Sequence, residues 1–172
     1  MNDAASPALA LQEAFHAIHD ERMRGLPFVN EALQVEAVGF REWEGRWLGI
    51  LITPWFMNLV LMPHRAGQWA AVKVGDAWRY RFPAGAFEFV GGHDPAVGEF
   101  QACSLFSPVF EFDDQDTARL TAIAALDALF DPAHREPAPY EPSPAAPAEP
   151  PQPTPMSKRD FLGVALGREP RR

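Results

Sequence analysis

The sequence has a single cysteine, Cys103, among its 172 residues. A disulfide within the chain needs two cysteines, and a zinc ribbon or a rubredoxin-type iron site needs several. All three are therefore excluded within this sequence. A lone free thiol is typical of proteins that work in a reducing compartment. We expect a cytoplasmic protein that folds without a metal and uses no cofactor.

Positive charge is scarce over most of the chain. The formal net charge is −8, and residues 156–172 contribute +3 to it, from five basic and two acidic side chains. The remainder therefore carries −11. An acidic body repels phosphate backbones, which argues against a nucleic-acid partner. A basic peptide or protein segment is the more natural ligand.

Long hydrophobic runs are also lacking, with one exception at residues 47–63, which carry no charge. This stretch approaches the length of a membrane-spanning helix. Pro54 and Asn58 interrupt it, however, which favours buried strands. Residues 1–14 show no basic start followed by an apolar run, so no secretory signal is predicted there. We expect a soluble protein without stable membrane insertion.

No catalytic motif is present. His16 and His19 lie three residues apart on a predicted helix and could share one face of it, but no third metal ligand is near them in sequence. Cys103 as a nucleophile would need a histidine base and an oxyanion site, whereas a small buried hydrophobic residue needs neither. The sequence favours a protein that is not an enzyme.

The pattern of apolar residues predicts an α+β domain. One helix begins at Ser6-Pro7 and ends at Gly25, and another begins at the acidic run 113–116 and ends at Asp131-Pro132. Between these helices lie segments rich in β-formers, at 35–40, 46–53, 55–62, 70–74, 78–82, 86–90 and 100–106. The polar corner 42–45 predicts one hairpin, and Gly75-Asp76 predicts a second. Because no long helical crossover separates the strands, we expect a mostly antiparallel sheet of about six strands, flanked by an N-terminal and a C-terminal helix.

The composition changes after this domain, which we place at residues 7–132. Nine of the 21 residues from 135 to 155 are proline, and such a segment cannot bury enough apolar surface to fold. We expect a disordered Pro-rich linker over 133–155. A basic tail over 156–172 follows it, and a defined motif on such a tether commonly binds something.

Several motifs in this order resemble the HybE/HupJ family of assembly chaperones for NiFe hydrogenases. They are Asn30-x-Ala32-Leu33-x-Val35, Val38-Gly39-Phe40, the run from Trp47 to Leu59, and Cys103-Ser104-Leu105-Phe106-Ser107-Pro108. The Thr-Pro-Trp-Phe-Met-Asn-Leu string at 53–59 is the most specific, and the resemblance covers about residues 15–130. Some relatives are joined to a rubredoxin module, for which these 172 residues lack the cysteines.

The resemblance implies a cytoplasmic maturation factor for hydrogenase precursors. The family is associated with the small, iron–sulfur subunit, whose precursor bears a twin-arginine leader, and with delaying export until assembly is complete. Some members are linked to the large subunit. Our candidates for partner contact are two segments: Trp55, Phe56, Met57 and Asn58, and Cys103, Ser104, Phe106 and Pro108. The aromatic and apolar side chains would anchor the partner, and Asn58 would hydrogen-bond to a peptide backbone.

The tail carries a short motif of its own, formed by Ser157, Lys158, Arg159, Phe161 and Leu162. It resembles the Ser-Arg-Arg-x-Phe-Leu core of a twin-arginine leader, with lysine in place of the first arginine. The apolar residues that follow it are too few for an export signal. Two interpretations remain: an unstructured basic tail, or a mimic that occupies the chaperone's own peptide site until a client displaces it.

A function of a different class is also open. A small-ligand-binding or thiol-dependent redox module could use Cys103. It would require a deep enclosed pocket beside an accessible thiol with a low pKa.

Overall fold

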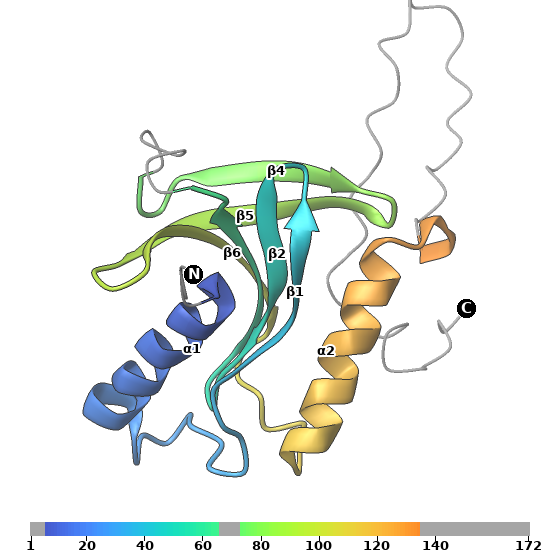
Figure 1. Ribbon diagram of the computed structural model, residues 1–172. Helices are drawn as coiled ribbons and strands as arrows, with labels where there is room; N and C mark the ends of the chain where they lie inside the picture. Colours follow the sequence, from blue (N-terminus) through green and yellow to red (C-terminus); the bar gives the residue numbers. More distant parts are fainter. Residues whose placement is uncertain (1–5, 66–72, 135–172) are drawn as a thin grey trace, which may run out of the picture.

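The computed structural model describes residues 6–65 and 73–134 (Figure 1). The chain begins with helix α1 (Pro7–Ile18) and continues through a π-helical turn, η1 (His19–Met23). Six strands follow: β1 (Glu36–Trp43), β2 (Arg46–Ile52), β3 (Met57–Pro63), β4 (Ala77–Phe82), β5 (Gly85–Asp94) and β6 (Gly98–Phe106). Helix α2 (Gln115–Leu129) and a short 3-10 helix, η2 (Pro132–His134), complete the described part. The tail motif and most of the predicted linker lie outside it.

The six strands form one antiparallel sheet in the order β1-β2-β3-β6-β5-β4. The sheet is strongly curved: β1 and β2 stand upright in Figure 1, whereas β4 and β5 run across their upper ends. The two helices lie on opposite sides of the upright strands. The predicted fold class, a single α+β domain with about six antiparallel strands and two flanking helices, is confirmed.

Each face of the sheet has its own apolar core, because alternate strand residues point to opposite faces. On one face, Leu51 and Val60 pack with Leu11 and Phe15 of α1. On the other face, the larger core gathers side chains from all six strands and from α2. The central strands β2 and β3 are therefore buried on both sides, which explains why their sequence reads as a nearly continuous apolar run. No helix among the described residues is long and apolar enough to span a membrane.

Helix α2 begins where the acidic run predicts. The side chain of Asp114 accepts a hydrogen bond from the backbone N–H of Thr117 at 2.7 Å, and this capping bond lowers the pKa of Asp114. Toward the sheet the helix presents mainly alanine, including the fully buried Ala118, Ala122 and Ala125. Small side chains let the helix backbone lie close to the strands. The acidic start was predicted from the sequence, whereas the choice of alanine for the buried face was not.

The second predicted hairpin, with arms at 70–74 and 78–82, is tested only in part: the turn before β4 is present, but residues 73 and 74 are not part of a strand. Gly75 lies in a turn before β4, and the β4–β5 hairpin instead turns at Pro83-Ala84. Strand β5 does not stop at Gly91-Gly92 but continues to Asp94, because both glycines pair with β6, where the ring of Phe100 covers Gly92. The chain turns at Val74-Gly75, where Asp76 N–H donates to the Lys73 carbonyl at 3.2 Å. Gly75 N–H also donates to the Gly91 carbonyl and Gly91 N–H donates to the Asp76 carbonyl, which extends the pairing of β4 with β5. Residues 70–72 of the predicted strand 70–74 lie outside the described part.

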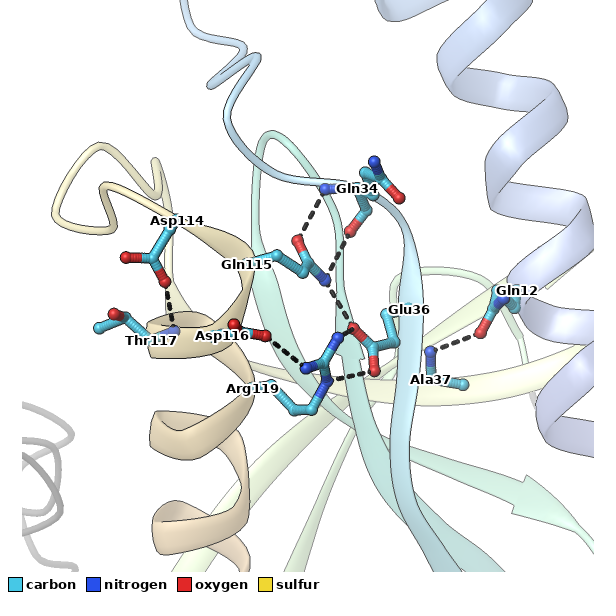
Figure 2. A network of polar contacts seen from close by, with 9 residues as sticks. All are labelled: Gln12, Gln34, Glu36, Ala37, Asp114, Gln115, Asp116, Thr117 and Arg119. Atoms are coloured by element: carbon cyan, nitrogen blue, oxygen red, sulfur yellow. Dashed lines mark hydrogen bonds and ion pairs between the residues drawn. The ribbon is translucent and has the colours of Figure 1, made fainter.

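A polar network joins the start of α2 to the start of β1 (Figure 2). The guanidinium of Arg119 donates to both carboxylate oxygens of Glu36, at 2.7 and 3.0 Å, and Gln115 Nε2 donates to Glu36 at 2.7 Å. Gln115 also exchanges hydrogen bonds with the backbone of Gln34. Two-pronged arginine–carboxylate pairs fix orientation as well as adding energy. The network therefore ties the first turn of α2 to the segment that enters β1.

This network should make stability pH-dependent in acid. Hydrogen bonds from Arg119, and then from Gln115, lower the pKa of Glu36 in the folded state. The stabilisation is therefore complete above about pH 5 and is lost as the pH falls through the lowered pKa. Arg119→Gln should melt below the wild type at neutral pH, and the gap should narrow toward about pH 3. Thermal unfolding of both proteins between about pH 3 and pH 7 measures the difference in melting temperature. A difference that does not change with pH would show that the Glu36–Arg119 pair is not its cause.

Candidate functional site

The segment Thr53–Phe56 forms a tight turn between β2 and β3. The buried Thr53 Oγ1 accepts hydrogen bonds from the backbone N–H groups of Trp55 (3.2 Å) and Phe56 (2.9 Å), and Thr53 N–H donates to the Phe56 carbonyl at 2.8 Å. The turn thus satisfies its backbone polar groups locally. Trp55 and Phe56 precede the strand, which begins at Met57. Their side chains are left half-buried on the face that α1 covers.

Asn30 anchors this turn to a second loop. Its backbone N–H donates to the Pro54 carbonyl at 2.6 Å. Its side-chain Nδ2 donates to the carbonyls of Val109 (3.0 Å) and Phe112 (2.8 Å), in the loop between β6 and α2. One asparagine therefore fixes the position of both segments that carry the predicted contact residues. The sequence pattern contained Asn30, but spacing alone did not reveal that it acts as this bridge.

Aromatic side chains of the turn pack against α1 and its π-helical extension. The Phe56 ring meets the edge of Phe15, with centroids 5.8 Å apart. The Trp55 ring stacks on His19 at 5.9 Å and contacts Phe56 at 5.6 Å. His19 begins the π-helical turn, a backbone feature that is frequent at functional sites. Sequence reasoning considered His19 only as half of a metal-ligand pair.

Two buried polar atoms in this region have no hydrogen-bond partner among the described residues: His19 Nε2 and Asn58 Oδ1. Asn58 lies opposite Ser104 of β6 and Leu51 of β2 in the sheet register. Ser104 is exposed. Buried polar groups in folded proteins are nearly always bonded, so an unpaired one indicates a water, a ligand or a partner group. Three such atoms occur in the described part of the chain, and the third, on Arg46, lies elsewhere.

We name this region the aromatic surface and define it as His19, Trp55, Phe56, Asn58 and Ser104. Its apolar members are half-buried rings with an exposed fraction available to a partner. Its polar members supply an unpaired carbonyl oxygen, an unpaired imidazole nitrogen and an exposed hydroxyl. The exposed parts of the two rings can contact apolar side chains of a peptide, and the exposed Ser104 hydroxyl can hydrogen-bond to it, whereas the two unpaired atoms are buried and become accessible only if the surface rearranges.

The other predicted contact residues do not join this surface. Met57, Cys103 and Phe106 are exposed by 0 %, 1 % and 6 % and belong to the core beneath α2. They point away from Trp55 and Asn58 because neighbouring strand residues alternate between faces. Pro108 is exposed in the loop after β6, which it joins through a cis Ser107-Pro108 peptide bond. The structure therefore brings together Trp55, Phe56, Asn58 and Ser104, four of the eight predicted positions.

Metal-ligand chemistry finds no support in the described residues. No group of three or more histidine, cysteine, aspartate or glutamate side chains there is placed to hold a metal ion. His19 stacks on Trp55, as described above, and its Nδ1 lies 3.8 Å from the Asp20 carboxylate.

Comparison with known proteins agrees with the fold and the motifs. The family model described as NiFe-hydrogenase assembly chaperone HybE matches residues 6–164. The hydrogenase expression/formation protein HupJ of Bradyrhizobium diazoefficiens is 43% identical over 164 residues, which cover 95% of this chain and 91% of the relative. A probable rubredoxin HupJ of Rhodobacter capsulatus is 41% identical over 121 residues, which cover 70% of this chain but 44% of that longer relative.

A solved structure shares the architecture. The solution structure of HybE from Escherichia coli superimposes with a TM-score of 0.58 at 26% identity, and the match covers 84% of this chain and 88% of HybE. The family model spans the whole described domain, including α1, the Thr53–Phe56 turn and α2. The chain belongs to the HybE family of NiFe-hydrogenase assembly chaperones.

Proposed function

We propose that this protein is a maturation chaperone that binds the precursor of a NiFe-hydrogenase small subunit, including its twin-arginine leader, in the cytoplasm. It would hold the precursor until assembly is complete and so coordinate assembly with export. The aromatic surface carries this proposal. Its half-buried Trp55 and Phe56 are the residue types that dominate binding energy in protein interfaces, and Asn58 Oδ1 is an acceptor that lacks a donor.

The geometry suits an extended apolar segment of a client. Trp55 and Phe56 stand at the end of the β2–β3 hairpin, beside the exposed Ser104 and the exposed Pro108. A client backbone N–H that reached Asn58 would satisfy the buried carbonyl oxygen, which water-excluded binding otherwise leaves unpaired at a cost of about 1–3 kcal/mol. Asn58 beside Trp55 and Phe56 would thus favour a client segment whose backbone N–H meets Asn58 while its apolar side chains meet the two rings.

Charge favours a basic region next to that segment. Outside residues 156–172 the chain carries a formal charge of −11, as counted above, against +3 for the tail. A twin-arginine leader combines positive charge with an apolar stretch, and its approach to an acidic protein is accelerated by long-range attraction. Other basic and apolar peptides share these two features, so a direct binding test identifies the client.

Co-purification with separately expressed hydrogenase subunits provides that test. We expect the small-subunit precursor to be retained and to lose at least about tenfold in affinity when its leader is deleted, because a difference of about 1.4 kcal/mol is already tenfold. The large subunit, prepared in the same way, is the comparison. Equal retention of the small subunit with and without its leader would show that the leader is not bound. Retention of the large subunit alone would show that the large subunit is the client.

The redox alternative depends on a reactive Cys103. The thiol is 1 % exposed and lies in the core beneath α2, opposite Leu59 of β3. Only the thiolate is a nucleophile, and burial in apolar surroundings raises the pKa of a thiol. The position of Cys103 therefore favours the chaperone over a thiol-dependent module.

A further inference from the structure

Helix α2 exposes an apolar stripe on the side turned away from the sheet core. Leu120 is 67% exposed and Ile123 is 43% exposed, whereas Leu126 and Leu129, the other leucines of the helix, are buried. Asp116 and Asp127 lie at either end of the stripe, at spacings of four, three and four residues, which place all four side chains on one helix face. The order along this face is acidic, apolar, apolar, acidic.

An open hollow of about 160 Å³ lies beside this stripe, between α2 and the edge strand β1. It is lined by Gly39, Arg41, Ile123, Leu126 and Asp127. Gly39 has a φ of 65°, and a Cβ there would lie 2.5 Å from Leu126 Cδ1. Glycine at this position lets β1 bulge over Leu126, where the register shifts between Val38 and Arg41.

Of the two charged residues that line the hollow, Arg41 is bound to the protein and Asp127 is open to solvent. The Arg41 guanidinium lies 4.4 Å from the centre of the Phe130 ring and donates to the Leu126 carbonyl at 3.4 Å, so it is held against the protein. Asp127 is exposed and forms no ion pair within the described part of the chain. Its carboxylate is therefore available to a cation from outside the domain. We name Gly39, Leu120, Ile123, Leu126 and Asp127 the α2 groove.

The chain's own tail has the complementary order. Lys158 and Arg159 are followed, after Asp160, by Phe161 and Leu162, so a basic pair precedes an apolar pair. The family model extends through residue 164, and thus includes this segment although it lies beyond the described domain. Basic side chains would meet Asp127, and the apolar pair would cover Leu120 and Ile123.

The tether length permits this contact. The described residues end at His134, which follows α2 directly. Twenty-three residues separate His134 from Lys158, and a Pro-rich sequence of this length can bridge up to about 70 Å at about 3.1 Å per residue. Ile123 lies six residues before the end of α2 at Leu129, about 9 Å along the helix at 1.5 Å per residue. A tether longer than the gap it must bridge gives an effective concentration near the millimolar range, so even a weak contact is populated.

We infer that Lys158–Leu162 docks intramolecularly on the α2 groove. This contact lies on the opposite face of the sheet from the aromatic surface, so the tail and a client on the aromatic surface can be bound at the same time. The leader-like motif alone would place the tail on the client site, whereas the contact inferred here places it on the opposite face. It does not depend on which hydrogenase subunit is the client.

Amide chemical shifts of the full chain test this contact without perturbing the folded domain. We expect Phe161→Ser/Leu162→Ser to shift the amide signals of Gly39, Ile123, Leu126 and Asp127 and to leave those of Trp55 and Asn58 unchanged. Thr154→Ala, in the linker, is the matched control and should change neither set. Shifts at Trp55 and Asn58 instead, or no shift in the domain, would overturn the inference.

Charge reversal adds a second readout. Asp127→Lys should release the tail and reproduce the shifts of the Phe161/Leu162 variant at Gly39 and Ile123. Adding Lys158→Glu and Arg159→Glu to Asp127→Lys should bring the tail back. The amide signals of Gly39 and Ile123 should then return at least halfway from their positions in Asp127→Lys to their positions in the wild type. The native shifts should also be unchanged by a tenfold dilution. Dependence on concentration would assign the groove to a second copy of the chain, and failure of the charge-reversed tail to restore the shifts would show that the tail does not contact Asp127.

Discussion

Replacing Trp55 by alanine should weaken binding of the small-subunit precursor by about thirtyfold, which corresponds to about 2 kcal/mol for an aromatic anchor in an interface. Trp55 is half-buried, packs on His19 and Phe56, and contributes no side chain to the main core beneath α2. Truncation should therefore lower the free energy of unfolding by less than about 2 kcal/mol, below the 3–5 kcal/mol typical of a fully buried aromatic residue. Calorimetric titration and thermal unfolding of the same variant separate the two effects.

Two variants control this experiment. Trp78→Ala removes another half-buried tryptophan, on β4, and should leave client affinity within about twofold of the wild type. Phe106→Ala removes a ring that is 6 % exposed, and should cost about 3–5 kcal/mol of stability. Unchanged client affinity of Trp55→Ala would exclude Trp55 from the interface. A stability loss as large as that of Phe106→Ala would assign it to the core.

Replacing Gly49 by alanine should destabilise the fold by about 2–3 kcal/mol and lower the melting temperature by about 10 °C. Gly49 is buried on β2, opposite Val60, and the Phe40 ring of β1 lies over it. A Cβ at this position would approach three Phe40 ring atoms to between 2.2 and 2.5 Å. The ring would have to leave its place on the α1 face, so its packing would be lost along with the close contact.

The double variant Phe40→Ala/Gly49→Ala identifies the cause. If the contact between Cβ and ring is responsible, the double variant should be about as stable as Phe40→Ala alone, because the second methyl group then has room. Additive losses from the two substitutions would show that Gly49 is required for another reason. Chemical denaturation at constant temperature gives the three free energies needed.

Local signals predicted the elements that they control directly. Asp114 and the acidic residues around it marked the start of α2, and Pro132 marked its end, because capping and proline act over only a few residues. The polar corner at Glu44-Gly45 marked the β1–β2 turn, where both residues have positive φ. Gly75-Asp76 gave the same signal, and the chain does turn there, but β4 pairs with β5 across a different turn at Pro83-Ala84. The backbone groups of Gly75 and Asp76 pair with Gly91, a contact between residues distant in sequence that no local pattern encodes.

The candidate site was found only in part for the same reason. The string from Thr53 to Leu59 was conspicuous because it is apolar, uncharged and interrupted by proline. It could not show that Trp55, Phe56 and Asn58 face α1 while Met57 faces the opposite core. His19 reaches Trp55 across 36 positions of sequence, and its unpaired Nε2 becomes visible only once both are in place.

By itself the sequence determined the buried apolar strands, the limits of α2, the acidic body and the separate basic tail, because each follows from residue type and short spacing. The tertiary structure decided which positions of the Trp55 and Cys103 segments a partner can reach. Strand alternation sends Asn58 and Ser104 to one face and Met57 and Cys103 to the other. Which face remains accessible depends on where α1 and α2 pack, and that is set by contacts between residues far apart in the chain.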